Sequence, residues 1–271
     1  MKDTSEKTLV DPAVEWGPFM PPEGVRLGRN GSQRWVEWQG IGRLVASGAE
    51  TKFWPAQDAD PVRLQKFRAT SLIACERYLL GRLSLHGSAV SMANGAVVLV
   101  GETGAGKSTT AMALVERTGG AFLADDIVPV DWHDGVPFVS PVEDQFWLTA
   151  ESASWFGVPA SRGRKTAYPP RARAIAAERL SAIVHLTFDE EERSLSLERL
   201  TGQKKFEVLS RAQVCYSDFE DADTVRNLQA RADLAMAVPV LRLRRVRSLG
   251  ALTTIMETFE AIVRDGTTCA T

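Results

Sequence analysis

The stretch Gly101-Glu102-Thr103-Gly104-Ala105-Gly106-Lys107-Ser108 decides the fold class of this chain. It follows the apolar run Ala96-Val97-Val98-Leu99-Val100 and opens a helix-forming run that extends to about Arg117. Its three glycines let the backbone turn tightly with its N–H groups pointing inward, and the following helix adds the positive end of its dipole. A strand, a glycine-rich loop and a helix in this order predict a site for the phosphates of a nucleotide.

The side chains of this loop indicate which ligand to expect. Lys107 supplies a cation for the β- and γ-phosphates, and the hydroxyl of Ser108 can bind Mg²⁺. We expect ATP with Mg²⁺, while GTP or pyrophosphate stays open. The residues expected to contact the nucleotide are Gly101, Glu102, Thr103, Gly104, Ala105, Gly106, Lys107, Ser108 and Thr109. The loop alone leaves open whether the γ-phosphoryl group passes to water or to an acceptor.

A pair of carboxylates, Asp125-Asp126, ends the apolar run Ala121-Phe122-Leu123-Ala124. A parallel strand beside the one that precedes the loop would bring both carboxylates next to the phosphates. Because adjacent side chains on a strand diverge, one carboxylate can bind Mg²⁺ while the other accepts a proton from an attacking hydroxyl. The alternative is a strand-ending turn with solvated acids.

Two further features could take part in the chemistry. His86 lies in Leu85-His86-Gly87-Ser88-Ala89-Val90, although His133 and His185 have the same chemical potential. The basic segment between Arg162 and Arg173 could supply a cation that neutralises the transferring phosphoryl group, and Lys165 is the candidate. The same segment could instead bind an acidic acceptor, or be a solvated loop.

The chain before the loop predicts two kinds of structure. Short β-type runs between Val25 and about Phe53 predict a small antiparallel unit, and apolar residues at helical spacing from Asp60 to Leu83 predict one long helix. Asn94-Gly95 predicts a hairpin turn. We therefore expect a β-rich unit over residues 1–60, and over residues 61–271 an α/β domain whose mixed sheet is flanked by helices.

The chain after the loop is harder to interpret. The proline-rich segment from about Asp131 to Arg179 predicts an irregular lid. Two apolar runs at 182–188 and 195–200 predict a second hairpin. The other expected elements are helices near 204–211 and 223–236, a strand at 238–243 and a helix at 249–263.

Composition excludes several classes of partner. The 271 residues are 44% hydrophobic and 24% charged, and a net charge of −2 provides no basic field for nucleic acid. No apolar run approaches the roughly 18 residues that span a bilayer, and the start has no apolar signal core. Three distant cysteines suggest neither a disulfide framework nor a metal site. We expect a cytoplasmic protein without membrane or nucleic-acid partners, and its oligomeric state stays open.

Three motifs together resemble a known family. Leu85 to Val90, Gly101 to Ser108 and Leu123-Ala124-Asp125-Asp126 have the order and spacing of the catalytic domain of HPr kinase/phosphorylase and its relatives. The resemblance implies a fold similar to that of HPr kinase and phosphoenolpyruvate carboxykinase, and transfer of phosphate to a serine hydroxyl. It also implies that Asp125 is the general base, that His86 lies beside it, and that Ser108 and Asp126 hold Mg²⁺.

The later chain resembles a particular branch of that family. Residues 141–156 and 238–243 are similar to the lasso-peptide kinases found beside peptide natural-product genes, which implies a peptide acceptor with a C-terminal serine. The glycine-rich stretch of the HPr kinases has no counterpart near residues 140–170, so phosphorylase activity and HPr as the substrate stay open. A kinase for a small molecule such as an amino acid, and a nucleotide-binding regulator without catalysis, are the alternatives.

Overall fold

The computed structural model describes residues 7–8, 24–30, 32–142, 144–159, 166–188, 195–214 and 221–264. Contacts divide the chain into two compact units, Met1–Ser84 with Val214–Thr224 and Leu85–Gln213 with Val225–Thr271. The sequence places the boundary near residue 60, whereas the contact division falls after Ser84. The reason is that Phe67, in the predicted helix, packs its ring against Trp38 of the β-rich sheet at 4.8 Å between centroids.

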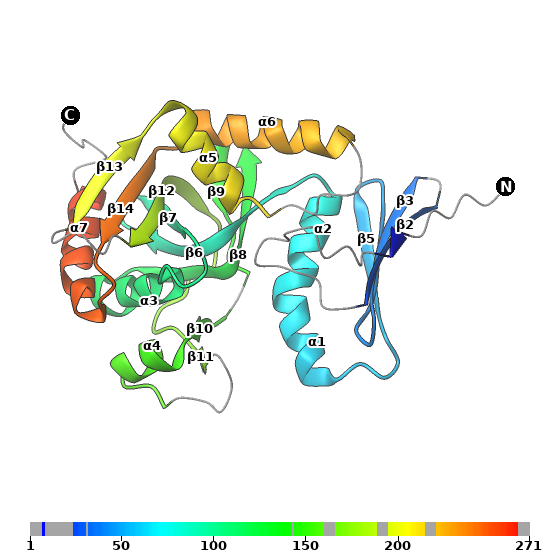
Figure 1. Ribbon diagram of the computed structural model, residues 1–271, viewed down its shortest axis with the longest axis horizontal. Coiled ribbons are helices and arrows are strands. Elements are labelled where there is room, and N and C mark those ends of the chain that lie inside the picture. Colours follow the sequence, from blue (N-terminus) through cyan, green and yellow to red (C-terminus); the bar gives the residue numbers. More distant parts are fainter. Residues whose placement is uncertain are drawn as a thin grey trace. The chain divides into compact units, whose positions relative to one another are not determined.

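The first unit contains a five-stranded antiparallel sheet whose strands follow their order in the chain, as the β-type runs predict (Figure 1). These strands are β1 (Lys7–Thr8), β2 (Val25–Asn30), β3 (Gln33–Trp38), β4 (Gly42–Ser47) and β5 (Glu50–Pro55). The buried side chains of the sheet alternate along β3 and β4, because successive residues of a strand point to opposite faces.

The predicted single helix is interrupted and shorter than expected. It consists of α1 (Pro61–Phe67), a π-helical turn η1 (Arg68–Leu72) and α2 (Ile73–Leu79). Asp60 caps its start, since a carboxylate oxygen accepts the N–H of Arg63 at 2.7 Å. The helix ends before Gly81, whose φ of 70° suits glycine, so Leu83 begins a strand instead of continuing the helix.

The second unit is built on a seven-stranded mixed sheet, which confirms the α/β class. Its strand order is β13-β14-β12-β7-β6-β8-β9, and β9 also pairs with the start of β12. The strands are β6 (Leu83–Met92), β7 (Gly95–Val100), β8 (Ala121–His133), β9 (Val136–Val139), β12 (Glu178–Phe188), β13 (Ser196–Leu200) and β14 (Val240–Arg245). The predicted hairpin at Asn94-Gly95 joins β6 to β7.

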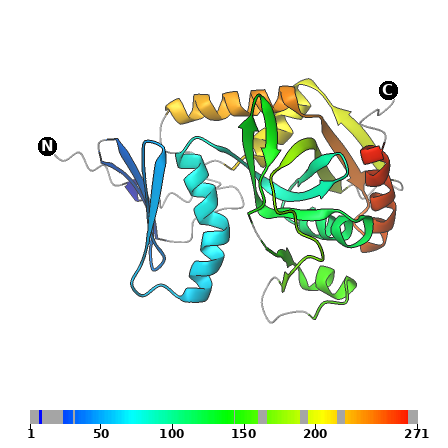
Figure 2. The same ribbon diagram turned by 180° about the vertical axis from the view of Figure 1, so that it is seen from behind.

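Helices cover this sheet. Within the second unit, α3 and α7 lie on one face, and α5 and α6 lie toward the other (Figures 1 and 2). The bounds are α3 (Lys107–Thr118), α5 (Gly202–Ala212), α6 (Asp221–Ala237), a 3₁₀ turn η2 (Leu249–Ala251) and α7 (Leu252–Arg264). Alternate residues of β12 and β14 bury against α3 and α7, among them Val184, Leu186, Leu241 and Leu243. None of the described helices has the length and apolar character needed to cross a membrane.

The segment predicted to be an irregular lid is largely regular. β8 and β9 form a hairpin whose turn residues, Asp134 and Gly135, have φ angles of 50° and 76°. Two positive φ angles are the signature of a type I′ turn, which Asp-Gly favours. After this hairpin come β10 (Phe146–Leu148), α4 (Ala150–Trp155) and β11 (Thr166–Tyr168). Residues 160–165 lie outside the described part.

The second predicted hairpin is wrong. β12 and β13 are not neighbours, because β14 lies between them, parallel to β12 and antiparallel to β13. β12 is also parallel to β7. The carboxyl ends of β7, β12 and β14 therefore meet at one edge of the sheet, and this is the edge from which the loop 101–108 emerges.

Candidate active site

The glycine-rich loop has the backbone conformation that its sequence predicts. Gly101, Gly104 and Gly106 have φ angles of 148°, 84° and 81°. A methyl group on Gly101 would lie 2.6 Å from the carbonyl oxygen of Leu186, so only glycine fits there. Lys107 begins α3, and its Nζ donates to the carbonyl oxygens of Gly101 at 2.9 Å and Glu102 at 3.1 Å. The ammonium group of Lys107 thus bonds back to the first two residues of the loop.

A buried carboxylate lies beside the first turn of α3. Asp125 is fully buried, and its Oδ1 accepts hydrogen bonds from Ser108 Oγ at 2.9 Å and Ser88 Oγ at 2.6 Å. Its Oδ2 accepts the N–H of Trp147 at 3.1 Å. Burial raises the pKa of Asp125 to about 6, the charge of Asp126 adds to this rise, and the three hydrogen bonds oppose it. The ionised carboxylate is therefore costly until a cation joins it.

The neighbouring carboxylate has a different environment. Asp126 is half-buried and has a φ of 62°, which interrupts the regular alternation of side chains along β8. His86 Nδ1 lies 3.1 Å from the carbonyl oxygen of Asp126, and the tautomer protonated at Nδ1 can donate to it. Since Gly87 pairs with Val100 at the end of β7, His86 lies at the same edge of the sheet as the loop.

Of the three histidines, only His86 lies at the carboxylate pair. His133 is exposed at the end of β8, with its ring against Phe138. Burial, together with the charges of Arg242 and Arg211, lowers the pKa of His185 to about 4, so its ring is neutral at pH 7. The structure thus separates three residues that the sequence leaves equivalent.

The prediction that the aspartates end a strand is wrong. β8 continues to His133 because Ile127, Val128 and Val130 are buried like the residues before the pair. Nor is β8 the neighbour of β7, since β6 lies between them. Asp125 reaches Ser108 across β6, and Ser88 of β6 bonds to the same carboxylate oxygen.

The structure leaves the predicted roles of several other residues untested. Lys165 lies outside the described residues. Thr109 is buried, and its hydroxyl bonds to Ser152 Oγ of α4 at 2.7 Å. Glu102 and Thr103 are exposed on the outer side of the loop.

Arg245 is a site residue that no sequence motif pointed to, and it lies against the loop. Its Nη2 donates to the carbonyl oxygen of Ala105 at 2.9 Å, and the whole residue is only 3% exposed. The sequence does carry a signal for it: alternate residues of β14, at positions 241, 243 and 245, face the core, so an arginine at 245 is expected to be buried. An arginine at a core position is the kind of exception that marks a functional site.

The donor set fits Mg²⁺. Ser108 and Asp125 offer a hydroxyl and a carboxylate oxygen 2.9 Å apart, and the charge of Asp126 is near enough to shift the pKa of Asp125. These are the hard oxygen ligands that Mg²⁺ prefers, and it commonly completes its shell with phosphate oxygens and water. Ser108 and Asp125 are thus the residues that would hold the ion, with the charge of Asp126 close by.

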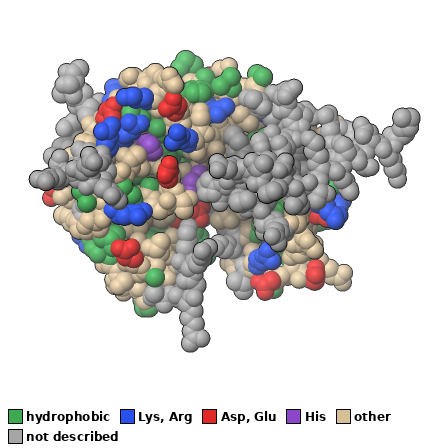
Figure 3. All heavy atoms as spheres, viewed as in Figure 1, with side chains coloured by type: hydrophobic (Ala, Val, Ile, Leu, Met, Phe, Trp, Pro, Cys, Tyr) green, Lys and Arg blue, Asp and Glu red, His purple; other side chains and the backbone are tan. Residues whose placement is uncertain are grey.

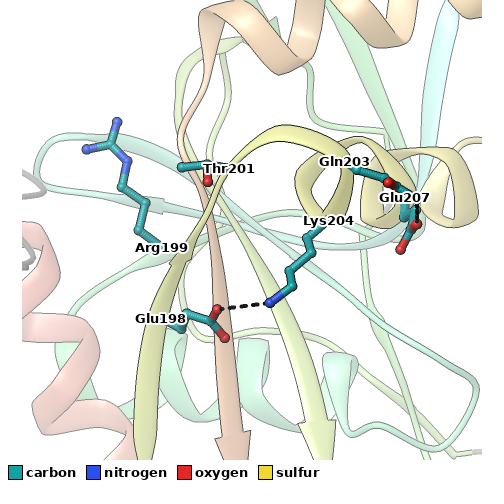
Figure 4. Close-up of a pocket in the computed structure, with 6 residues that line it drawn as sticks. All are labelled: Glu198, Arg199, Thr201, Gln203, Lys204 and Glu207. Carbon is teal, nitrogen blue, oxygen red and sulfur yellow. Dashed lines mark hydrogen bonds and ion pairs between the residues drawn. The ribbon is translucent and has the colours of Figure 1, made fainter.

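Another concave region of the second unit has several of its charges paired. A pocket of about 550 Å³ lies between β13 and α5 (Figure 4) and is lined by Glu198, Arg199, Thr201, Gln203, Lys204 and Glu207. Glu198 pairs with Lys204, Arg242 and Arg244, and Gln203 donates to Glu207 at 2.7 Å. Basic and acidic side chains are interspersed over β13 and β14 in Figure 3. The loop with its carboxylates remains the stronger candidate.

Comparison with known proteins gives a remote likeness to a solved structure. No family model matches this chain, and no curated protein matches it either. Among solved structures, the chain is similar to the Hpr(Ser) kinase/phosphatase from Coxiella burnetii, with a TM-score of 0.38 and 11% sequence identity. The match covers 67% of this chain and 97% of that one. Because so remote a likeness establishes no function, the proposal that follows rests on the geometry of the site.

Proposed function

We propose that this protein is an ATP- and Mg²⁺-dependent kinase that transfers the γ-phosphoryl group to a serine-type hydroxyl of a peptide or protein. The observation that carries the proposal is the hydrogen bond of 2.9 Å between Ser108 and the buried Asp125. It joins the start of α3, where a phosphate loop collects anions, to a carboxylate that forms no ion pair with the described residues. A nucleotide–Mg²⁺ complex would meet both needs.

The geometry favours a division of labour opposite to the one that the family resemblance implies. Asp125 is fully buried and bonded to Ser88, Ser108 and the N–H of Trp147, so an acceptor hydroxyl has little room to reach it. Asp126 is only half-buried. We therefore assign Asp125, with Ser108, to the metal and Asp126 to the proton.

The proposed transfer needs no covalent intermediate. The acceptor oxygen attacks the γ-phosphorus, the bond from that phosphorus to the β,γ-bridging oxygen breaks, and ADP leaves. The hydroxyl proton passes to Asp126. Lys107 neutralises charge on the β- and γ-phosphates, and His86 holds the carbonyl of Asp126 and thereby the backbone that carries the base. Mg²⁺, when bound, supplies further neutralisation of the phosphate charge.

The acceptor that we propose is a serine-bearing peptide, in particular a lasso-precursor peptide with a C-terminal serine. This substrate class comes from the sequence resemblance. The same proposal places the protein in the cytoplasm, where ATP is present.

The test is transfer itself. Wild-type protein is incubated with Mg²⁺, ATP and peptides that end in serine, with serine-to-alanine peptides as controls, and intact mass is recorded. We expect one added phosphate on the serine peptides alone. Asp126→Asn should bind ATP yet lose transfer by about 100-fold or more, as expected for a missing general base.

Other outcomes point to the alternative functions. Phosphate found on a free amino acid and on no peptide would identify a small-molecule kinase. ATP that binds without being consumed would identify a regulator. Normal turnover in Asp126→Asn would remove that residue from the role of base.

A further inference from the structure

Two arginines lie against one aromatic ring at the loop edge of the sheet. Arg245 ends β14 and pairs in register with Phe188, which ends β12. The guanidinium carbons of Arg245 and Arg247 lie 4.8 Å and 4.9 Å from the centroid of the Phe188 ring. Because β12 and β14 run parallel to β7, this cluster lies where β7 delivers the chain to the phosphate loop.

Arg245 is a buried cation without a counter-charge in the described part of the chain. Its Nη2 bonds to the Ala105 carbonyl at 2.9 Å and to Thr110 Oγ1 at 3.5 Å, while its Nε is buried without a hydrogen-bond partner. A methyl group on Gly106 would lie 2.4 Å from this Nη2, so the loop and the guanidinium are in close contact. A buried charge is costly unless an opposite charge joins it. The loop is therefore suited to a strongly anionic ligand.

Arg247 is exposed and adjoins the loop at its outer rim. A methyl group on Gly104 would lie 3.6 Å from Arg247 Nη2. Within the described residues, its guanidinium contacts only the Phe188 ring and makes neither a hydrogen bond nor an ion pair. The ring holds the side chain by a cation–π contact worth about 0.5–1 kcal/mol at an exposed site, which a phosphate contact can easily exceed.

The position of Gly104 suggests which phosphate Arg247 meets. Gly104 lies upstream of Lys107, on the side of the loop away from the helix that follows. The terminal phosphate must face the acceptor, so we place it at the exposed rim of the loop, where Gly104 and Arg247 lie. The planar guanidinium fork of arginine matches phosphate oxygens in a bidentate way that lysine does not.

We propose that Arg247 contacts the γ-phosphate of the bound nucleotide and neutralises charge on it during transfer, and that Arg245 is a positioning residue that holds the loop through Ala105. The inference rests on the proposed nucleotide site. Arg247 gives up no proton and forms no covalent bond in this role. In this role Arg247 supplies a cation at the transferring phosphoryl group.

The experiment compares the affinities of Mg·ATP and Mg·ADP by calorimetry. Arg247→Gln should weaken Mg·ATP about tenfold or more and leave Mg·ADP within about twofold, because only ATP has the contacted phosphate. Arg247→Lys should recover part of the loss. Arg199→Gln is the matched control, since Arg199 is an exposed arginine of the same sheet that pairs with Leu241, four positions before Arg245. It should bind both nucleotides as the wild type does.

Arg245→Lys separates positioning from contact. It keeps the charge but loses the bond geometry at Ala105, so ATP and ADP should weaken together. Thermal unfolding of each variant shows whether it is folded, and the exposed Arg247 can be replaced without disturbing the core.

Each outcome has a distinct meaning. Wild-type binding of both nucleotides, with Arg247→Gln equal to wild type or weakened equally for ATP and ADP, overturns the inference and leaves the proposed function standing. Wild-type protein that binds neither nucleotide contradicts the proposed function and, with it, this inference.

Discussion

Asp125 keeps an ionisable carboxyl where water does not reach it, and this has a measurable effect on folding. Its pKa is raised from 3.8 to about 6, mainly by burial. The folded state therefore binds this proton more tightly than the unfolded state. As pH rises from about 4 to 6, deprotonation of Asp125 therefore lowers the free energy of unfolding by about 3 kcal/mol. The group destabilises the fold once it is ionised.

Asp125→Asn isolates this effect. The free energy of unfolding of wild type minus that of Asp125→Asn should fall as pH rises from 4 to 6 and stay level above that range, in the absence of nucleotide and metal. The lost bond from the Trp147 N–H adds an offset that does not depend on pH. The measurement is chemical denaturation at several pH values. A difference that is flat or rises with pH contradicts the assigned pKa shift.

Gly106 and Gly119 are two glycines with nearly the same backbone and very different surroundings. Their φ angles are 81° and 75°, but a methyl group on Gly106 would meet Arg245, whereas one on Gly119 would meet nothing within 4 Å. Gly119→Ala should cost only the left-handed strain of about 1 kcal/mol. Gly106→Ala should cost more and also weaken Mg·ATP.

Thermal unfolding and nucleotide binding of both alanine variants check this prediction. Equal losses of stability in the two variants, with ATP affinity unchanged in Gly106→Ala, would show that Arg245 is not in close contact with Gly106.

At the scale of elements, a buried pair of hydroxyls joins α4 to α3, and Arg117 of α3 also lies over the Trp155 ring of α4. Ser152 is 5% exposed, and its Oγ bonds to Thr109 Oγ1 at 2.7 Å and accepts from Thr149 Oγ1 at 3.1 Å. Ser152→Ala leaves Thr109 without this partner and should cost about 1 kcal/mol. Amide exchange over residues 146–155 should then speed up while α3 stays protected.

Ser154→Ala is the control for that exchange measurement, because Ser154 lies in the same short helix and is exposed. If both variants exchange alike, the contact between Thr109 and Ser152 does not anchor α4.

The elements also show what the sequence can and cannot predict. Local signals worked: the loop, the Asn94-Gly95 turn and the helix that was expected to extend to about Arg117 lie where the residues predict. The Asp134-Gly135 turn carried an equally local signal that was overlooked in a proline-rich segment. The pairing of β12 with β14 instead of β13 could not be predicted, because it depends on a strand some 50 residues later.

The same limit applies to the site. Lys107 and Ser108 follow from a contiguous motif, and Asp125 from its closeness in the chain. Ser88 and Arg245 join them only through sheet pairing, and the bond from the Trp147 N–H depends on the path of a later segment. No spacing rule connects these positions, so the structure was needed to find them.

At the scale of the whole molecule, the residues of the proposed site all belong to the second unit. The β-rich unit has its own core, in which Val36, Trp38 and Leu44 are buried, and it contributes none of the side chains assigned to the nucleotide. The second unit alone is therefore expected to bind Mg·ATP, through the loop with Lys107 and through Asp125, the carboxylate bonded to Ser108.

Titration of ATP with and without Mg²⁺ into the full-length protein tests that claim most directly. Wild-type protein should bind ATP, and Mg²⁺ should strengthen the binding. Lys107→Ala should weaken ATP about tenfold or more, and Ser108→Ala should keep Mg²⁺-free binding while losing most of the gain from Mg²⁺. Unchanged ATP affinity in Lys107→Ala, or a full Mg²⁺ effect in Ser108→Ala, would contradict the account.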